Sequence, residues 1–534
     1  MSRQGPDRRH GDGQQTRQRR IAALSSVRVI LGVVTGLLGF LGPALAAEAL
    51  TPGGTLAVGL TADIAHFDVF HAIGYEAYWA LENIHSGLVR ADSQGQILPD
   101  MATSWDVKDD GRTYVFHLQQ GITFHDGTPA DAAAIKWNIA YILDPANSAD
   151  TRVFFKAIAT VEALDDATLQ IQLREPSADF LMVLGGYYTG FLVASPTAVK
   201  RWGSDYKFHP VGAGPFKFVE WTPGQQVILE KNAHYFKPGL PYLDRIVLKT
   251  MKDATTQLGA VRAGELTFAT WVPLEMVRVL ERVPEVQVVS GPMYNVWDLC
   301  MNVARPPFDD LRVRQVVAGY GIDRQEILKL GFSGYGQPSV SMLTPGMPGY
   351  NSLLERYPYD PPKAKALLQE AGYGPGHPLA FTFLSPTIEP ALTNVPTLLK
   401  AQLARLGVQM KIETLDKVTW MDRFIRKHDF EMTMGNVTAM ALGNLALIFE
   451  TTALLNLTRH RDTRVDTLFQ QWRTTTEPTA HAQATAQLQG YLAEQLYLAG
   501  LANTPFSHAV RDYVKGYTFV DKLQLNFETA WLAQ

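Results

Sequence analysis

Apolar and polar residues alternate strictly in two short stretches, which is the pattern of β-strands with one buried face. In residues 113–118, Tyr114, Phe116 and Leu118 fall on one face. Residues 168–173 repeat the period, with leucine, isoleucine and leucine at alternate positions. Asp-Asp-Gly at 109–111 and Asp-Gly at 126–127 mark tight turns around the first strand. These patterns predict a unit rich in β-hairpins.

Helical spacing begins between these two strands. Asp131 can cap a helix in which Ile135, Ile139 and Ile142 share one face. After residue 211, helical and strand patterns alternate with short connections, and we expect helices at 250–264, 361–371 and 395–406 and strands at 285–289 and 408–412. Such alternation favours an α/β fold with mainly parallel sheets flanked by helices.

The first 46 residues have the composition of an export signal. Arginines at 17, 19, 20 and 28 precede an apolar run at 29–41, and Ala-Leu-Ala at 44–46 fits a small-x-small cleavage site. The run is too short to span a bilayer comfortably, so we expect cleavage near Ala46 rather than a membrane anchor. The only cysteine, Cys300, lies far downstream, which excludes a lipid-anchored form and an intrachain disulfide. We therefore expect a free periplasmic protein.

Length and charge narrow the classes of function. At 534 residues the chain exceeds one ordinary core, so two or three domains are expected. The export signal holds seven arginines and two aspartates, so the mature chain is more acidic than the net −4 of the whole sequence. A mildly acidic chain has no electrostatic reason to bind nucleic acid or an anionic membrane surface.

Residues 98–129, LPDMATSWDVKDDGRTYVFHLQQGITFHDGTP, carry the most specific signature in the chain. The segment resembles the family 5 extracellular solute-binding proteins, the peptide- and nickel-type receptors of ABC importers. Strings on either side are similar to that family in its order and spacing: GGTLAVGLTADIAHFD (53–68), ENIHSGLVRAD (82–92), VGAGPFKFVEWTPGQQVILEKNAHYF (211–236), PYLDRIVLK (241–249), AGELTFA (263–269), PPFDDLRVRQVVAGYGIDRQEI (306–327) and YDPPKAKALLQEAGY (359–373). The resemblance covers almost the whole mature chain.

The resemblance implies a two-lobed α/β periplasmic-binding-protein fold with an additional α+β domain inserted in the first lobe. Lobe I would comprise residues 47–88, 197–285 and 505–534, the inserted domain residues 89–196, and lobe II residues 286–504. Lobes joined by a few crossings can close over a ligand by hinge motion. The resemblance thus implies a monomeric receptor without a cofactor. It would capture a peptide or similar small organic solute in the inter-lobe cleft and deliver it to an ABC permease and its ATPase.

Four stretches would line that cleft if the resemblance holds. The loop after the first strand would offer Asp63 and Phe67, the first crossing Thr270 and Trp271, the second crossing Tyr294 and Trp297, and lobe II Trp420 and the Asn436 of a Gly-Asn-Val turn. Aromatic rings supply apolar area and, in Tyr and Trp, a polar group, which suits varied organic ligands. The alternative for each ring is an ordinary place in a core.

One departure from the family pattern concerns the charge of the ligand. Peptide-binding members follow a Gly-Trp with an acid that pairs with the ligand's α-ammonium. Here the matching run, FEMTMGNVTAMALGN (430–444), has Val437 in place of Trp, and no acid occurs from 433 to 449. A buried ammonium without a carboxylate costs several kcal/mol. A free-amine peptide is therefore disfavoured unless another acid, such as Asp63 or Asp422, serves.

Catalytic patterns are absent from the sequence: it has no Gly-x-Ser-x-Gly, no His-Glu-x-x-His, no phosphate-binding Gly-x-x-x-x-Gly-Lys and no paired cysteines. His117 and His125 are interpreted as a strand and a turn histidine rather than metal ligands. We therefore predict a binding protein rather than an enzyme. Two alternatives to a transport receptor stay open, namely a sensor or periplasmic chaperone without a transport role, and a periplasmic hydrolase.

Overall fold

The structure of the chain is a computed structural model. It describes residue 50 and residues 52–533, except 72–73, 187–189, 294, 346, 348, 439–441, 454 and 521–523. The predicted export signal at 1–46 lies outside the described residues, as does Tyr294. Within the described ranges, no helix is both long and apolar enough to cross a membrane.

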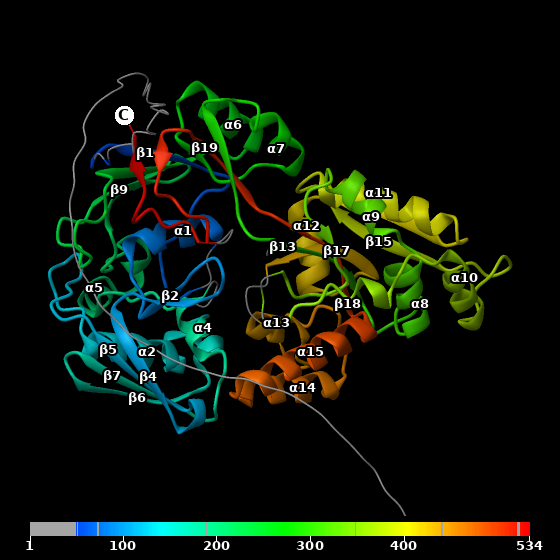
Figure 1. Cartoon of the computed structure of the whole chain (residues 1–534), viewed down its shortest axis with the longest axis horizontal. Helices are drawn as coiled ribbons and strands as arrows, with labels where there is room; N and C mark the ends of the chain where they lie inside the picture. The colour runs from blue at the N-terminus through cyan, green and yellow to red at the C-terminus, as the bar shows by residue number, and fades with distance from the viewer. Residues whose placement is uncertain are drawn as a thin grey trace, which may run out of the picture. The chain divides into compact units, whose positions relative to one another are not determined.

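The first large sheet is the centre of lobe I (Figure 1). In the described part of the chain its seven strands are ordered β12 (Val286–Ser290), β19 (Ser507–Arg511), β11 (Phe268–Ala269), β1 (Thr55–Leu60), β10 (Arg245–Thr250), β9 (Gln226–Lys231) and β8 (Phe216–Thr222). β1 is parallel to β10 and β11, and the other pairs are antiparallel. Its helices are α1 (Tyr75–Ile84), α6 (Ala254–Ala263) and α7 (Leu274–Leu280). A small pair, β20 (Val514–Lys515) and β21 (Trp531–Leu532), adjoins it.

The inserted domain contains the hairpins predicted from sequence. Its antiparallel sheet has the order β4 (Ala102–Lys108), β5 (Thr113–Leu118), β7 (Thr168–Leu173) and β6 (Ile158–Asp165). Tyr114, Phe116 and Leu118 all enter the core of this domain, as the alternation predicts. Helix α2 (Ala132–Leu143) packs on β6 and β7, and the Asp131 carboxylate accepts a hydrogen bond from its first turn as predicted. The domain also contains β2 (Val89–Ala91), β3 (Ile97–Pro99), α3 (Arg152–Phe155), α4 (Phe180–Gly185) and α5 (Pro196–Trp202).

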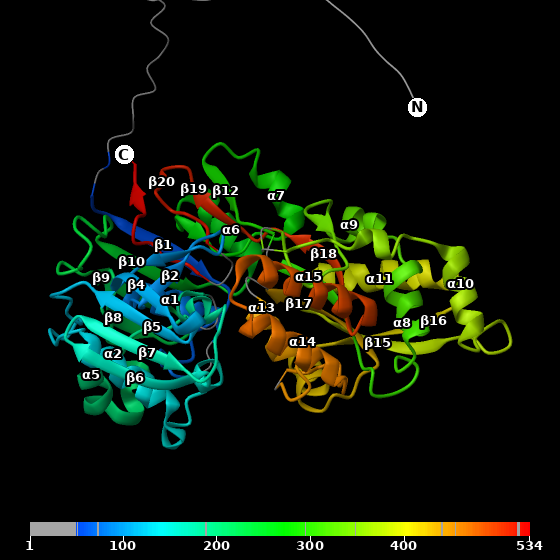
Figure 2. The ribbon, with the colours of Figure 1, turned by 60° about the horizontal axis from the view of Figure 1, so that its bottom comes forward.

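Lobe II is a sheet between two layers of helices (Figure 2). Among described residues its strands are ordered β14 (Gln337–Pro338), β18 (Leu498–Thr504), β13 (Asn295–Met301), β17 (Met432–Thr438), β15 (Ala380–Pro386) and β16 (Gln409–Leu415). One face packs on α8 (Leu311–Gln315), α9 (Arg324–Gly331), α10 (Pro361–Glu370) and α11 (Ala391–Ala404). The other face packs on α12 (Lys417–Met421), α13 (Leu442–Phe449), α14 (Thr463–Thr474) and α15 (Pro478–Gln495).

The expectation of mainly parallel sheets is wrong. In lobe II only β15 is parallel to its neighbours β16 and β17, and the remaining described pairs are antiparallel. The reason is that β13, β18 and β19 arrive from distant parts of the chain and insert between the α/β units. Two helix boundaries also differ from expectation. Helix α6 begins at Ala254, capped by the Asp253 carboxylate, because Thr250 still pairs in β10, and α11 begins at Ala391 and accommodates a proline in its interior.

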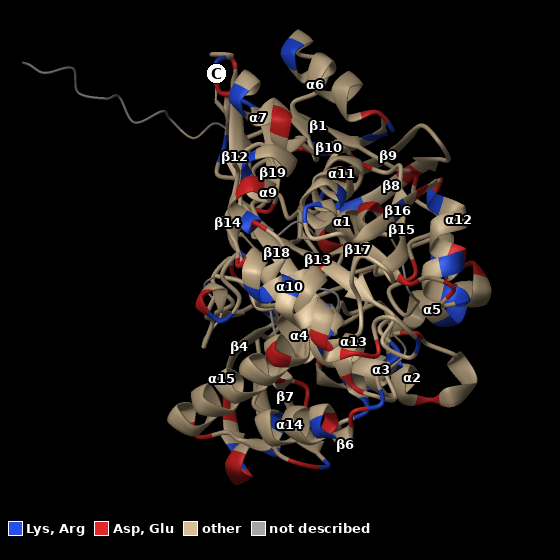
Figure 3. Ribbon diagram, turned by 90° about the vertical axis from the view of Figure 1, so that its right-hand side faces the viewer, with Lys and Arg blue, Asp and Glu red and all other residues tan. Residues whose placement is uncertain are grey.

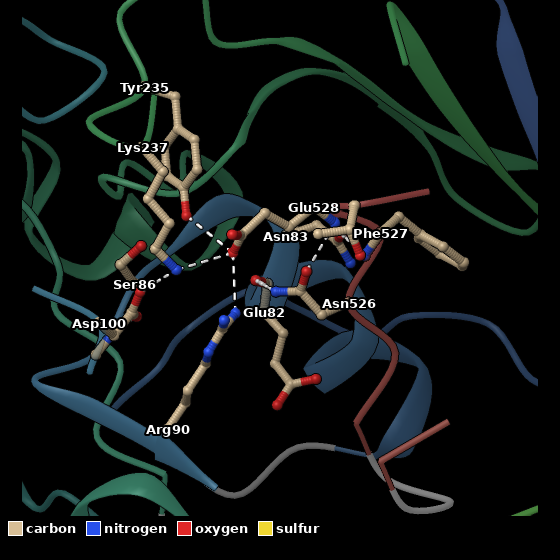
Figure 4. A network of polar contacts seen from close by, with 12 residues as sticks. Glu82, Asn83, Ser86, Arg90, Asp100, Tyr235, Lys237, Asn526, Phe527 and Glu528 are labelled. Atoms are coloured by element: carbon tan, nitrogen blue, oxygen red, sulfur yellow. Dashed lines mark hydrogen bonds and ion pairs between the residues drawn. The ribbon is translucent and has the colours of Figure 1, made fainter. Parts of the chain in front are cut away.

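The C-terminal strip of lobe I is fastened by a polar network (Figure 4). The Asn83 amide donates to the carbonyls of Trp79 and Leu525 and accepts from the Phe527 N–H. The buried Glu528 carboxylate accepts from Arg90 at 3.1 Å, Tyr235 at 3.1 Å and Lys237 at 3.0 Å. Lys237 also reaches Asp100 at 2.8 Å. These contacts hold the strip, α1 and the entry to the inserted domain in one rigid unit.

The sheets suggest one adjustment to the expected domain boundaries. β12 pairs with β19 in the sheet of lobe I, so we propose that lobe II begins after Ser290 rather than at residue 286. Helix α5 packs in the core of the inserted domain, so we propose that this domain extends through Trp202, and the remaining boundaries stay as proposed from the sequence. Acidic and basic residues are interspersed along the ribbon in the view of Figure 3.

Candidate functional site

The chain passes between the two lobes in adjacent crossings. One crossing leads from Ser290 at the end of β12 to Asn295 at the start of β13, and the other joins β18 to β19 through Pro505 and Phe506. The crossings are tied together, because the Gly291 N–H donates to the Phe506 carbonyl at 2.9 Å and the hydroxyls of Ser290 and Ser507 lie 2.7 Å apart. The carboxyl ends of β1 and β11 lie beside the start of β19, the end of β17 pairs with the start of β13, and β18 leads directly into a crossing. In α/β folds, ligands bind at such strand ends.

A glycine lets the crossings pack tightly. A Cβ at Gly291 would lie 1.9 Å from the Phe519 ring, closer than any real contact. Phe519 in turn packs against His508, with ring centroids 4.9 Å apart. The crossings thus pack against the Phe519 and His508 rings of lobe I. This packing limits how the lobes can rotate about the crossings.

The sequence-based prediction of a crossing at Thr270 and Trp271 is wrong, because this segment follows β11 and stays in lobe I. Thr270 is fully buried, and its hydroxyl donates to the Gly59 carbonyl at 2.7 Å. Trp271 is half-buried, with its ring edge-on to Phe506 at 5.4 Å. Trp271 therefore contacts the crossing between β18 and β19 through the Phe506 ring. The Thr270 hydroxyl instead binds the backbone of lobe I.

The loop after β1 separates its two predicted residues. Phe67 is fully buried in the core of lobe I, against Phe218 and Trp221, so it does not offer a surface to a ligand. Asp63 is exposed, and its carboxylate accepts the Gly224 N–H at 2.8 Å. That bond fixes the turn between β8 and β9, away from the crossings.

Trp297, predicted in the second crossing, and Trp420, predicted in lobe II, are both core residues of lobe II with satisfied indole groups. Trp297 is 2% exposed, donates to the Thr504 hydroxyl at 2.9 Å and packs on Phe332. Trp420 is 9% exposed and donates to the Thr433 hydroxyl at 2.9 Å. Sequence alone could not distinguish such rings from ligand platforms, because both kinds of site use the same residue types.

Asn436 is the predicted residue of lobe II that keeps an accessible side. It lies in β17 directly opposite Trp297 of β13 and is half-buried. The structure therefore brings Trp297 and Asn436 together on neighbouring strands and joins Trp271 to the crossings. It does not bring Asp63, Phe67 or Trp420 to them.

Sequence reasoning missed a buried carboxylate at the centre of lobe II. Asp298 is 1% exposed, and its Oδ2 has no hydrogen-bond partner among the described residues. Burial raises its pKa to about 7. Its ladder neighbours are Gly435 and Gly500, and a Cβ at Gly435 would lie 3.2 Å from Oδ2. The signal was present, since Asp298 is the one acid in a strand that is otherwise apolar after Asn295.

A second buried titratable group lies on the lobe I side. His508 is 1% exposed, and its Nδ1 lies 2.9 Å from the Thr270 carbonyl oxygen. Its Nε2 has no partner within the described part of the chain. Burial lowers the pKa of His508 to about 3, so the ring is neutral at physiological pH.

Two surface hollows lie elsewhere. One of about 620 Å³ is on α14, and one of about 550 Å³ is beside α9, and neither is lined by a residue predicted from the sequence. No group of three or more His, Cys, Asp or Glu side chains able to hold a metal ion occurs among the described residues. His117 pairs with Asp106 at 3.1 Å and His125 lies 3.0 Å from the Gly214 carbonyl oxygen, so both have structural partners.

Two α/β lobes joined by paired crossings, with an extra domain in the first lobe, define the class of two-lobed solute-binding proteins. The chain belongs to the bacterial extracellular solute-binding proteins of family 5, whose middle-region model matches residues 96–447. It is 33% identical over 388 residues to the glutathione-binding protein GsiB of Shigella dysenteriae serotype 1, an alignment that covers 73% of each protein.

Solved structures agree on the fold. The substrate-binding protein CtaP of Listeria monocytogenes superposes with a TM-score of 0.82 at 21% identity, covering 91% of this chain and all of that one. The binding protein AgaA from A. tumefaciens R10, solved with agropinic acid, gives 0.78 at 26% identity, covering 90% of this chain and 99% of that one. The chain is thus a solute-binding protein, as its signature at 98–129 implied.

Proposed function

We propose that the protein is an exported, periplasmic receptor that captures a small peptide-like solute between its lobes and delivers it to an ABC permease with its ATPase. The observation that carries the proposal is the pair of crossings, onto which the strand ends of both lobes converge. Membership of the solute-binding family and the 33% identity to a glutathione-binding protein support the same class of ligand.

Within the proposed cleft, Trp271 and Asn436 are the strongest candidates for ligand contact. Both are half-buried, one beside the crossings in lobe I and the other at the end of β17 in lobe II. A tryptophan offers apolar area with an N–H donor, and an asparagine offers both a donor and an acceptor. This combination suits a short amide-containing ligand. Tyr294, predicted from the sequence to lie in the second crossing, stays in the proposal.

Whether the site can bind a positively charged ligand depends on whether an acidic residue lies beside it. The acid-free run at 433–449 disfavours a free amine. Asp298 lies next to Gly435 on the adjacent strand, but it is 1% exposed and faces the opposite side of the sheet from Asn436, so a free amine stays disfavoured. Comparing a peptide with its N-acetylated form measures whether the ammonium contributes.

Thermal unfolding of the mature protein with a ligand panel tests the proposal. The panel comprises glutathione, di- and tripeptides, an opine, a sugar and a nickel–histidine chelate, and native mass spectrometry first identifies any co-purified ligand. We expect a dissociation constant near micromolar, about −8 kcal/mol, and a matching rise in Tm for one member. Absence of any Tm shift and of any co-purified molecule would refute the receptor proposal.

Substitutions then test the contacts. Trp271→Ala and Asn436→Ala should weaken binding of the best ligand at least tenfold while preserving the unfolding transition. Trp202→Ala, a partly exposed tryptophan of the inserted domain, is the matched control and should leave affinity unchanged. Equal affinity in all three variants would remove Trp271 and Asn436 from the site. Recovery of the ligand unaltered after incubation separates binding from hydrolysis.

A further inference from the structure

The lobes touch at a second place, remote in sequence from the crossings. Residues 175–179, the loop between β7 and α4 of the inserted domain, meet the end of α14 and the start of α13 in lobe II. The Ala178 N–H donates to the Arg473 carbonyl at 3.0 Å, and the Gln470 amide donates to the Glu175 carboxylate. Figures 1 and 2 both place α14 beside the end of the inserted sheet, whereas the crossings run from β19 and β12 to the lobe II sheet.

The loop is held in place by its own domain. The Tyr114 hydroxyl donates to the Ser177 carbonyl at 2.8 Å, and the Ser177 N–H donates to the Gly111 carbonyl at 3.2 Å. The Ser177 hydroxyl also donates to the Asp179 carboxylate at 2.7 Å. Loop 175–179 therefore presents a preformed surface to lobe II rather than a chain that must be ordered on contact.

Glycines on both sides make the contact close. A Cβ at Gly443, in the first turn of α13, would lie 2.3 Å from the Asp179 carboxylate. A Cβ at Gly111 would lie 2.9 Å from the Thr476 methyl group of lobe II. Gly443 is inside a helix, where glycine costs about 1 kcal/mol relative to alanine. The absence of a side chain at Gly443 leaves room for the Asp179 carboxylate.

The contact is also small and lies at the surface. Four of its residues are exposed to solvent: Glu175, Ala178, Gln470 and Thr476. Among the described residues, two hydrogen bonds join the lobes at this contact. A contact of this size supplies only a few kcal/mol, which is the scale at which open and closed forms exchange.

We propose that loop 175–179 and its partners on α13 and α14 form a latch that closes the lobes without a ligand. The crossings act as the hinge, and the latch holds the opposite side. The unliganded receptor then has a substantial closed population, and a solute enters only when the latch opens. This regulation of ligand entry rests on the proposed receptor function, whereas the latch itself is a property of the unliganded chain.

Distance measurement between two spin labels on the unliganded mature protein tests the latch. Val107→Cys in the inserted domain and Tyr359→Cys in lobe II give exposed label sites, while the native Cys300 is buried and escapes labelling. Gly443→Ala is the opening variant, and we expect about a tenfold fall in the ratio of closed to open molecules, which appears as a shift to longer distances. Gly490→Ala in α15 is the matched control, because nothing lies within 3.9 Å of its Cβ.

A surface charge change gives an independent test that does not touch the core. Gln470→Glu places an acid against Glu175 and should also lengthen the distance, more at low salt than at high salt. Glu175→Gln in the same chain removes the repulsion and should restore the wild-type distribution.

The outcomes separate the latch from the receptor function. Identical distance distributions for the wild type, Gly443→Ala and Gln470→Glu would overturn the latch, whatever the ligand panel shows. A ligand panel without a hit, together with the expected distance shifts, would leave the latch standing and reject the receptor proposal. Adding glutathione as a probe to each variant then reports whether closure by a ligand compensates for the open latch.

Discussion

Replacing Asp298 with asparagine should make the stability of the protein less dependent on pH. Burial raises the pKa of this carboxyl from 3.8 to about 7 in the folded state. Between these values the unfolded chain releases the proton and the folded chain keeps it, so the folded state binds more protons. Stability therefore falls as pH rises from about 4 to about 7.

The size of this effect follows from the shift. Three pKa units correspond to roughly 4 kcal/mol of stability, present at acid pH and lost above pH 7. Asp298 contacts no cation among the described residues, and the shift arises from burial alone, so nothing offsets the loss. The amide that replaces the carboxyl cannot ionise, and the variant should therefore gain on the wild type by up to this amount as pH rises.

Urea unfolding at pH 5, 6, 7 and 8 measures the difference directly. We expect the free energy of unfolding of Asp298→Asn minus that of the wild type to rise through this range and then level off. Asp309→Asn, which changes an exposed carboxyl, is the control and should give a flat difference. A flat difference for Asp298→Asn as well would show that the carboxyl has a partner when folded and would refute the argument.

Three further substitutions test parts of the fold. Glu528→Gln removes the negative charge that binds Lys237. It should lower the free energy of unfolding in urea by about 2 kcal/mol, because hydrogen bonds to a charged group are lost. Trp297→Ala should cost about 4 kcal/mol by leaving a cavity in lobe II, and a small loss would mean that the core collapses around it. Gly291→Ala should cost about 2 kcal/mol through collision with the Phe519 ring, and Phe519→Ala in the same chain should recover most of it.

Local patterns in the sequence predicted local structure well. The alternation at 168–173 matches β7 residue for residue, and the Asp131 cap begins α2 where expected, because both features depend on neighbours in the chain. Strand direction was missed, since β13, β18 and β19 pair with partners more than a hundred residues away. The helix predicted at 395–406 begins earlier, at Ala391, and tolerates Pro396 in its interior, where proline usually breaks a helix.

The candidate site was harder to predict for a physical reason. Phe67, Trp297 and Trp420 have the composition of ligand platforms, but tertiary packing buries them completely or nearly so. A sequence does not distinguish an exposed aromatic residue from a buried one. An acidic residue within an apolar strand, in contrast, can be recognised from the sequence alone. Asp298 is therefore the residue that sequence reasoning could have found. Asn436 was predicted in a turn but lies in β17, and its role in ligand contact stays a prediction.

The signature at 98–129 identifies the family, and its turn also contributes to closure, because Gly111 lies against Thr476 of lobe II. Ligand recognition is proposed at Trp271 and Asn436, on other segments. Recognition and closure then make separable contributions to affinity. Opening the latch should raise the association rate for every ligand by a common factor, since it changes only the population of open molecules. Changing Asn436 should instead alter the ranking of ligands. A latch variant that reordered the ligand panel would show that the two segments are energetically coupled.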